Sequence, residues 1–176
     1  AETDRPDVVV GVGGYASGPV GIAAALFMFS ALSWYREEFK PLRTSAFYLS
    51  FGLLVVGSMV LIGELSQPLR FLNMLNPAYL NFRSPLAWGS ILLGLFGAVS
   101  VGYFLMLRKK NDDASRRLAL LGSLLALGLP IYTGFDLSVH QARPVWNSAL
   151  IPVLFVAMSV TTGAAVASFL AKGEAK

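Results

Sequence analysis

The sequence predicts an all-α integral membrane protein that crosses the membrane about five times. Of its 176 residues, 55% are hydrophobic and only 14% are charged, whereas soluble domains carry about 25% charged residues. The charged residues are spaced so that long uncharged runs lie between them. These runs are continuously apolar and lack the alternation typical of membrane β-strands. Composition therefore argues against a soluble enzyme, a disordered chain and, because cysteine is absent, a disulfide scaffold.

Each apolar run reaches the roughly 17–25 residues that a helix needs to cross the hydrocarbon. We expect spans at about 12–35, 44–64, 84–107, 118–138 and 146–171, within one helical-bundle domain that covers residues 1–176. In chain order, the charged residues that bound the runs are Asp7 and Arg36, Arg43 and Glu64, Arg83 and Arg108, Arg117 and Asp136, and Arg143 and Lys172.

The first and fourth spans need a further argument. The segment before the first run is acidic, and the run is longer than the apolar part of a signal peptide, so we expect a retained helix. The fourth run is the shortest, so its helix crosses fully only if it carries Asp136 into the membrane.

The basic residues predict the orientation. The first loop, the third loop and the C-terminus hold 10 of the 14 lysines and arginines, and the N-terminus, second loop and fourth loop hold 4. The positive-inside rule then places the N-terminus outside, in the periplasm, and the C-terminus in the cytoplasm. We therefore interpret the excess positive charge as a topology signal and expect no nucleic-acid partner.

The chain lacks the residues for a redox or metal centre of its own. It has one histidine, His140, and no cysteine, so it cannot supply two haem ligands or ligate an iron–sulfur cluster. Phosphate-binding loops, dinucleotide-binding glycine motifs and metal-spaced carboxylate pairs are also missing. We expect no catalytic residues and no metal site, so any redox chemistry must come from a diffusible ligand or a partner protein.

Four polar side chains near the predicted outer ends are candidates for quinone binding or proton exchange: Glu64, Tyr132, Asp136 and His140. Tyr132 and Asp136 are four residues apart, so they share a helix face. A phenol can hydrogen-bond a quinone carbonyl, and a carboxylate can exchange the accompanying proton. An alternative without a specific function is also open: the carboxylates lie in headgroup water, the tyrosine belongs to the interfacial aromatic belt, and the loop histidine is solvated.

Four motifs resemble those of the polysulfide reductase membrane-subunit family (NrfD/PsrC type). The first is Glu64-Leu65-Ser66-Gln67-Pro68-Leu69-Arg70-Phe71, and the second is Arg83-Ser84-Pro85-Leu86-Ala87-Trp88-Gly89. The third is Tyr132-Thr133-Gly134 followed by Arg143-Pro144-Val145-Trp146-Asn147, and the fourth is Leu154-Phe155 with Ser159, Thr162 and Gly163. They occur in the family's order and spacing, and the resemblance covers about Gly14 to Ala167.

The resemblance implies a function in electron transfer. Such a subunit lies in the bacterial or archaeal inner membrane as a multi-pass protein and binds a quinone, menaquinone or ubiquinone, non-covalently near its outer face. It passes electrons between this quinone and a docked iron–sulfur subunit that serves a molybdopterin-type catalytic subunit. Tyr132 is the residue expected to hydrogen-bond the quinone, and Glu64 matches the family's acidic position. The expected docking residues are Arg70, Arg83, Arg143, Trp146 and Asn147.

Two departures from the family leave alternatives open. Typical members have eight or more spans, so we expect a compact five-helix variant completed by further membrane subunits or a second copy. The family's polar quinone contacts before the first helix are replaced by Pro6-Asp7-Val8-Val9-Val10. One alternative is a purely structural subunit of a respiratory complex, and a second is a small ion-coupled transporter, although no inverted repeat is visible.

Overall fold

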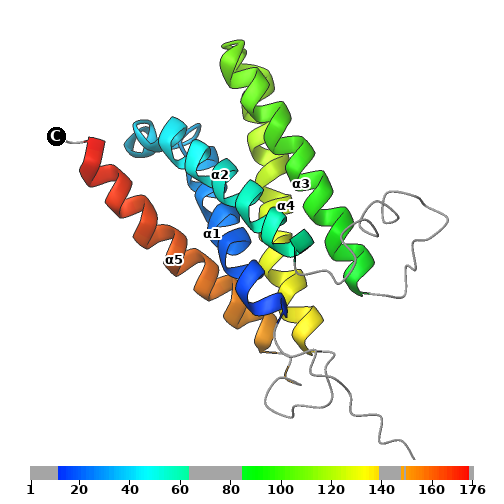
Figure 1. Cartoon of the computed structure of the whole chain (residues 1–176). Coiled ribbons are helices and arrows are strands. Elements are labelled where there is room, and N and C mark those ends of the chain that lie inside the picture. Colours follow the sequence, from blue (N-terminus) through cyan, green and yellow to red (C-terminus); the bar gives the residue numbers. More distant parts are fainter. Residues whose placement is uncertain (1–11, 64–84, 139–147, 149, 175–176) are drawn as a thin grey trace, which may run out of the picture.

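The computed structural model describes residues 12–63, 85–138, 148 and 150–174 (Figure 1). These residues form five α-helices and one short 3-10 helix, and no strand occurs in the described part. The helices are α1 (Val12–Leu32), α2 (Leu42–Gly63), α3 (Pro85–Arg108), α4 (Asp112–Ser138) and α5 (Ile151–Glu174), with the 3-10 helix η1 (Glu37–Phe39) between α1 and α2. The predicted all-α class is confirmed.

Four of these helices are long and apolar enough to cross a membrane: Leu42–Val60, Ala87–Arg108, Asp112–Ser138 and Ile151–Ala171. In α1, the apolar stretch whose side chains the structure describes is the shorter Gly18–Leu32. The chain is therefore a multi-pass membrane protein. Its exposed leucines, valines and phenylalanines are the side chains expected to face lipid; the side chain of Phe169, for example, has an exposed fraction of 75%.

Helix α4 extends beyond the apolar run that predicts it. It begins at Asp112 instead of Leu118 and continues through Asp136 to Ser138. At its N-terminus, the side-chain Oδ1 of Asn111 accepts a hydrogen bond of 3.1 Å from the backbone N–H of Ala114. This bond satisfies one of the free backbone donors of the first turn, and Asp112 and Asp113 complement the helix dipole. Local capping therefore adds a polar turn that a hydropathy pattern does not indicate.

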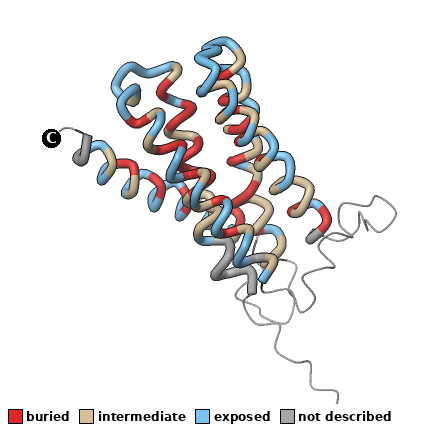
Figure 2. The backbone as a smooth tube through the Cα atoms, turned by 45° about the horizontal axis from the view of Figure 1, so that its top comes forward, coloured by how far each residue is buried: buried red, intermediate tan, exposed pale blue. Residues whose placement is uncertain are grey.

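Helix α1 lies at the centre of the bundle. It contacts α2, α4 and α5, while α3 packs mainly against α4 (Figure 1). The C-terminal part of α5 diverges from the other helices, so the α4 face that it covers near Gly134 is left uncovered at the opposite end. Figure 2 shows the buried residues on the sides of α1 to α4 that face one another.

An aromatic cluster forms the core. The ring of Phe27 on α1 lies 5.2 Å from that of Phe96 and 5.4 Å from that of Tyr103, both on α3, and 6.1 Å from that of Phe47 on α2, measured between centroids. All four side chains are fully buried. Most of the pairs are edge-to-face, the arrangement that aromatic quadrupoles favour. The cluster thus joins three helices through side-chain packing.

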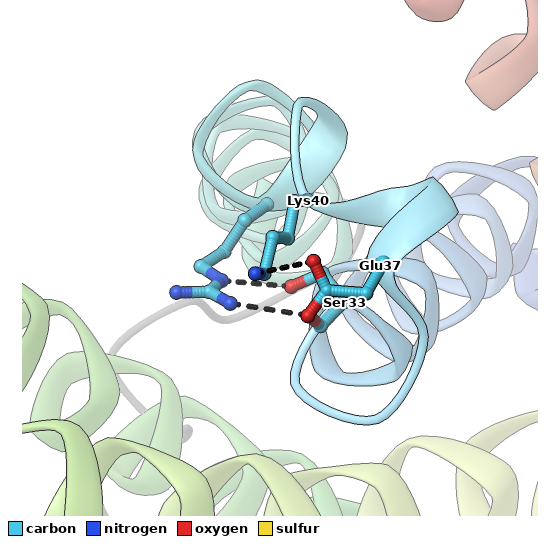
Figure 3. A network of polar contacts seen from close by, with 4 residues as sticks. Ser33, Glu37 and Lys40 are labelled. Carbon is cyan, nitrogen blue, oxygen red and sulfur yellow. Dashed lines mark hydrogen bonds and ion pairs between the residues drawn. The ribbon is translucent and has the colours of Figure 1, made fainter.

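A polar network closes the bundle at the end formed by residues 33–43 and 108–117, which we call the basic end. Arg43 Nε donates to Ser33 Oγ at 2.9 Å, and its guanidinium lies 3.7 Å from the centre of the Trp34 ring. Trp34 Nε1 in turn donates to the buried Tyr103 hydroxyl at 2.9 Å. Figure 3 shows the hydrogen bonds to Ser33 and the Lys40–Glu37 ion pair at this turn. These bonds tie α1 to α2 and α3.

Glycines allow two close contacts between α5 and its neighbours. A methyl group at Gly163 would overlap the Cβ of Ala25 on α1, and one at Gly134 on α4 would overlap the backbone of Pro152 on α5. Close approach through small residues is how helices associate in lipid, where the surrounding acyl tails are as apolar as the helices. Ser159 adds a hydrogen bond of 2.6 Å to the carbonyl of Gly21 on α1.

Replacing Gly134 with alanine is expected to destabilise the α4–α5 contact. The added methyl group meets backbone atoms of Pro152, which cannot rotate away, and overpacking of this kind costs about 1–3 kcal/mol. The matched control is Gly97→Ala, because a Cβ at Gly97 has nothing within 4 Å. Thermal unfolding in detergent measures both variants. Equal stability of the two variants would contradict this packing.

Candidate functional site

The candidate site lies at the end of the bundle opposite the basic end, around the last turns of α4. Pro130 is buried within this helix and carries no backbone N–H. The carbonyl of Ala126 therefore lacks the helical hydrogen bond that the N–H of residue 130 would otherwise donate. One turn later, Thr133 Oγ1 donates to the carbonyl of Leu129 at 3.0 Å. This part of α4 is apolar in composition but contains polar oxygens in the backbone carbonyl of Ala126 and the hydroxyl of Thr133.

Tyr132 is partly buried and points toward α3. Its ring packs over Gly89, which is buried, and a methyl group at that position would overlap the phenol ring and its hydroxyl. Gly89 therefore provides the space that the Tyr132 ring occupies. Glycine in the Trp88-Gly89 motif has a structural reason that the sequence alone did not reveal.

Asp136 follows Tyr132 by one turn of α4 and is also partly buried. At 100° per residue, its side chain is rotated by roughly 40° from that of Tyr132, toward the side of Thr133. The two side chains thus lie on one side of α4, as their spacing requires. A phenol donor and a carboxylate are then present together near the end of a membrane helix.

A pocket of about 250 Å³ lies at the same end of the bundle, between α1, α4 and α5. Its lining residues are Gly18, Val20, Gly21, Ile22, Leu129, Pro130, Thr133, Phe155, Met158, Ser159 and Thr162. The sequence analysis did not identify this pocket. The signals that point to it are the small residues of α1 and Pro130 of α4, which keep the helices from filling the space.

The hydroxyl groups of the pocket are already used as donors. Thr133 donates to Leu129 as described, Ser159 donates to Gly21, and Thr162 Oγ1 donates to the carbonyl of Met158 at 2.7 Å. A hydroxyl has one hydrogen, so these groups offer acceptor lone pairs and no free donor. A quinone carbonyl needs a donor, and an apolar tail needs none. The pocket therefore suits an apolar tail, and the donor for a carbonyl must come from elsewhere.

The structure keeps Tyr132 and the pocket on different sides of α4. Tyr132 is not among the lining residues, whereas its neighbour Thr133 is. Asp136 projects between these two directions. The other predicted site and docking residues lie outside the described residues: Glu64, Arg70, Arg83, His140, Arg143, Trp146 and Asn147. Within the described part, no group of three His, Asp or Glu side chains is arranged to hold a metal ion.

Comparison with known proteins shows which family the chain belongs to. The pattern of the family described as polysulphide reductase, NrfD, matches residues 19–174. The chain belongs to this family. The match includes all the described side chains of the candidate site except Gly18. The resemblance inferred from the four motifs is therefore confirmed.

The chain is similar to several proteins of known subunit type. The chain is 31% identical over 140 residues to the C subunit of tetrathionate reductase from Salmonella typhimurium, a match that covers 76% of this chain and 41% of that protein. It is 29% identical over 124 residues to the C component of polysulfide reductase from Wolinella succinogenes, covering 61% and 38%. It is 22% identical over 146 residues to the Hdr-like menaquinol oxidoreductase integral membrane subunit of Archaeoglobus fulgidus, covering 82% and 36%.

The chain thus spans about two fifths of the length of these relatives. No solved structure matches it. Each of the named relatives is one component of a reductase or oxidoreductase.

Proposed function

We propose that this protein is the quinone-interacting membrane subunit of a multisubunit oxidoreductase. It passes electrons between a membrane quinone, menaquinone or ubiquinone, and a docked iron–sulfur subunit of a molybdopterin-type enzyme. It holds no catalytic centre, haem or cluster of its own. The observation that carries the proposal is that the phenol of Tyr132 and the carboxylate of Asp136 lie on the same turns of α4 as an apolar pocket, in a chain of the NrfD family.

The pocket and the Tyr132–Asp136 pair bind different parts of the quinone. The pocket, with its used hydroxyl donors, holds the apolar tail of a quinone between Pro130, Phe155 and Met158. The ring of the quinone then lies toward the end of α4, where Tyr132 donates a hydrogen bond to a carbonyl. A bound quinol supplies two electrons and two protons. Asp136, near the membrane surface, accepts the two protons one after the other and releases each to water, while the two electrons pass to the iron–sulfur subunit.

The orientation and the docking surface are parts of the same proposal. The basic end faces the cytoplasm, because the connections there hold most of the lysines and arginines. The Tyr132 end then faces outside, where the iron–sulfur subunit docks on residues 64–83 and 136–147 and the molybdopterin-type subunit follows it. Further membrane subunits or a second copy complete the assembly.

One observation favours a second candidate function, a purely structural membrane subunit. Tyr132 packs on Gly89 and does not line the pocket, so its phenol ring also serves the contact between α3 and α4. If that contact is its whole role, another subunit binds the quinone. The same experiment separates the two functions.

The test is to purify the complete assembly in mild detergent through a tag on this protein and to analyse it by native mass spectrometry. The proposal predicts iron–sulfur and molybdopterin-type subunits together with bound quinone. It also predicts that filling the pocket by Met158→Trp removes the quinone while the partner subunits remain. An assembly whose quinone content is unaffected by Met158→Trp would favour the structural subunit. Isolation of this protein without any partner would contradict both functions.

A further inference from the structure

The basic end carries more positive charge than its own acidic residues neutralise. Its cationic side chains are Arg36, Lys40, Arg43, Arg108, Lys109, Lys110, Arg116 and Arg117, and its acidic side chains are Glu37, Glu38, Asp112 and Asp113. Among the described residues, the structure records one ion pair, between Lys40 and Glu37. An anion from outside the protein is therefore expected here.

Three arginines at this end lie over aromatic rings: Arg43 over Trp34, Arg108 over Phe104 and Arg116 over Tyr35. The ring under Arg108 belongs to its own helix, α3, whereas the other two contacts join different parts of the chain. Arg43 lies over Trp34 and uses Nε and Nη2 in hydrogen bonds to Ser33, so its position belongs to the fold. Arg116 on α4 is different. Its guanidinium lies 4.6 Å from the centre of the Tyr35 ring, which follows α1, and this stacking orients it while leaving its donors available. Arg116 is thus a pre-positioned cation at the depth of an interfacial aromatic residue.

The helix face below Arg116 is apolar and uncovered. Leu120 and Leu124 follow on α4 at intervals of four residues, with exposed fractions of 52% and 70%. Gly134 lies five turns from Arg116 on the same side of α4, and there α5 covers the helix through Pro152. Because α5 diverges toward its C-terminus (Figure 1), the same face remains open at the basic end.

We propose that this face binds an acidic phospholipid. The phosphate of the lipid accepts hydrogen bonds from Arg116, stacked on Tyr35, and one acyl chain lies along Leu120 and Leu124 on the α4 face that α5 leaves uncovered. A phospholipid is the anion that places a phosphate at the membrane surface and an apolar tail directly below it. Basic pockets between membrane helices bind acidic headgroups in this way. Asp112 and Asp113 lie about one turn before Arg116 on α4, and their carboxylates repel a phosphate. Because they offset part of the positive charge, binding depends on the orientation of Arg116 as well as on the excess charge.

The test uses the full-length protein in detergent, titrated with phosphatidylglycerol and followed by native mass spectrometry. Arg116→Gln is expected to weaken phosphatidylglycerol binding about fivefold, which corresponds to one basic contact at a membrane surface. The matched control is Arg117→Gln, which removes the same charge from the next residue, an exposed side chain pointing about 100° away on the helix. The control is expected to bind nearly as the unmodified protein does. Equal weakening in both variants would overturn the site in favour of general attraction.

Two further measurements fix the source of the anion. Phosphatidylcholine, which has no net charge, is expected to bind more weakly than phosphatidylglycerol, and equal binding would overturn the proposal. Glycerol 3-phosphate, which lacks acyl chains, is expected not to displace the lipid. Displacement at equal concentration would show a site for free phosphate and would likewise overturn it. Leu124→Asn supports the contact with the acyl tail if it weakens lipid binding while the unfolding temperature is kept.

Discussion

Replacing Tyr132 with phenylalanine is expected to slow quinol oxidation by the assembled complex about tenfold to hundredfold. In the proposed site, the phenol donates a hydrogen bond to a quinol oxygen that becomes negatively charged as the quinol loses a proton. Hydrogen bonds to charged groups contribute about 1.5–3 kcal/mol, which converts to this loss of rate. The measurement is quinol turnover by the purified complex, followed by absorbance. The ring that packs on Gly89 stays in place, so the helices should remain assembled.

The matched control for this substitution is Tyr48→Phe. Tyr48 lies on α2 with an exposed fraction of 52%, so the same loss of a hydroxyl there faces away from the candidate site. Turnover of the control should equal that of the unmodified complex. If the Tyr132 variant also turns over at the normal rate, Tyr132 has no role in binding the quinone. Its packing against Gly89 would then be its whole contribution.

Phe27→Ala is expected to produce the largest loss of stability, about 3–5 kcal/mol, as for other phenylalanines removed from a core. The fully buried ring contacts Phe47, Phe96 and Tyr103, and Gly122 on α4 leaves room for it. Its removal opens a cavity where α1 meets α2, α3 and α4. Unfolding by denaturing detergent, monitored by circular dichroism, measures the change.

The control for the core is Phe169→Ala. Phe169 lies on α5 with an exposed fraction of 75%, so its truncation leaves no cavity inside the bundle. A change in stability within about 0.5 kcal/mol is expected for this lipid-facing position. A similar loss in both variants would show that the aromatic cluster does not hold the helices together.

The helices were predictable because their cause is local. A run of apolar residues bounded by charges must satisfy its backbone hydrogen bonds within the membrane, and a helix does so within one segment. The start of α4 was not indicated in this way. Its first turn is stabilised by Asn111 and two aspartates, which a hydropathy pattern excludes from the span.

The candidate site was predictable in part. The spacing of Tyr132 and Asp136 places them on one side of a helix whatever the rest of the fold is. The direction of that side is a property of the bundle, because it depends on which helix packs there. The contact of Tyr132 with Gly89, and the pocket where α1 and α5 meet α4, arise from neighbours far apart in the sequence. No local pattern specifies them.

The most direct measurement of quinone binding is photoaffinity labelling of the complex with an azidoquinone, followed by peptide mass spectrometry. We predict labels on α4 between Leu129 and Asp136 and on α5 between Phe155 and Thr162, the segments around the pocket and Tyr132. Excess unlabelled quinone should remove them. Labels confined to the lipid-facing sides of α2 and α3, or labels that unlabelled quinone does not displace, would contradict a quinone site in this protein.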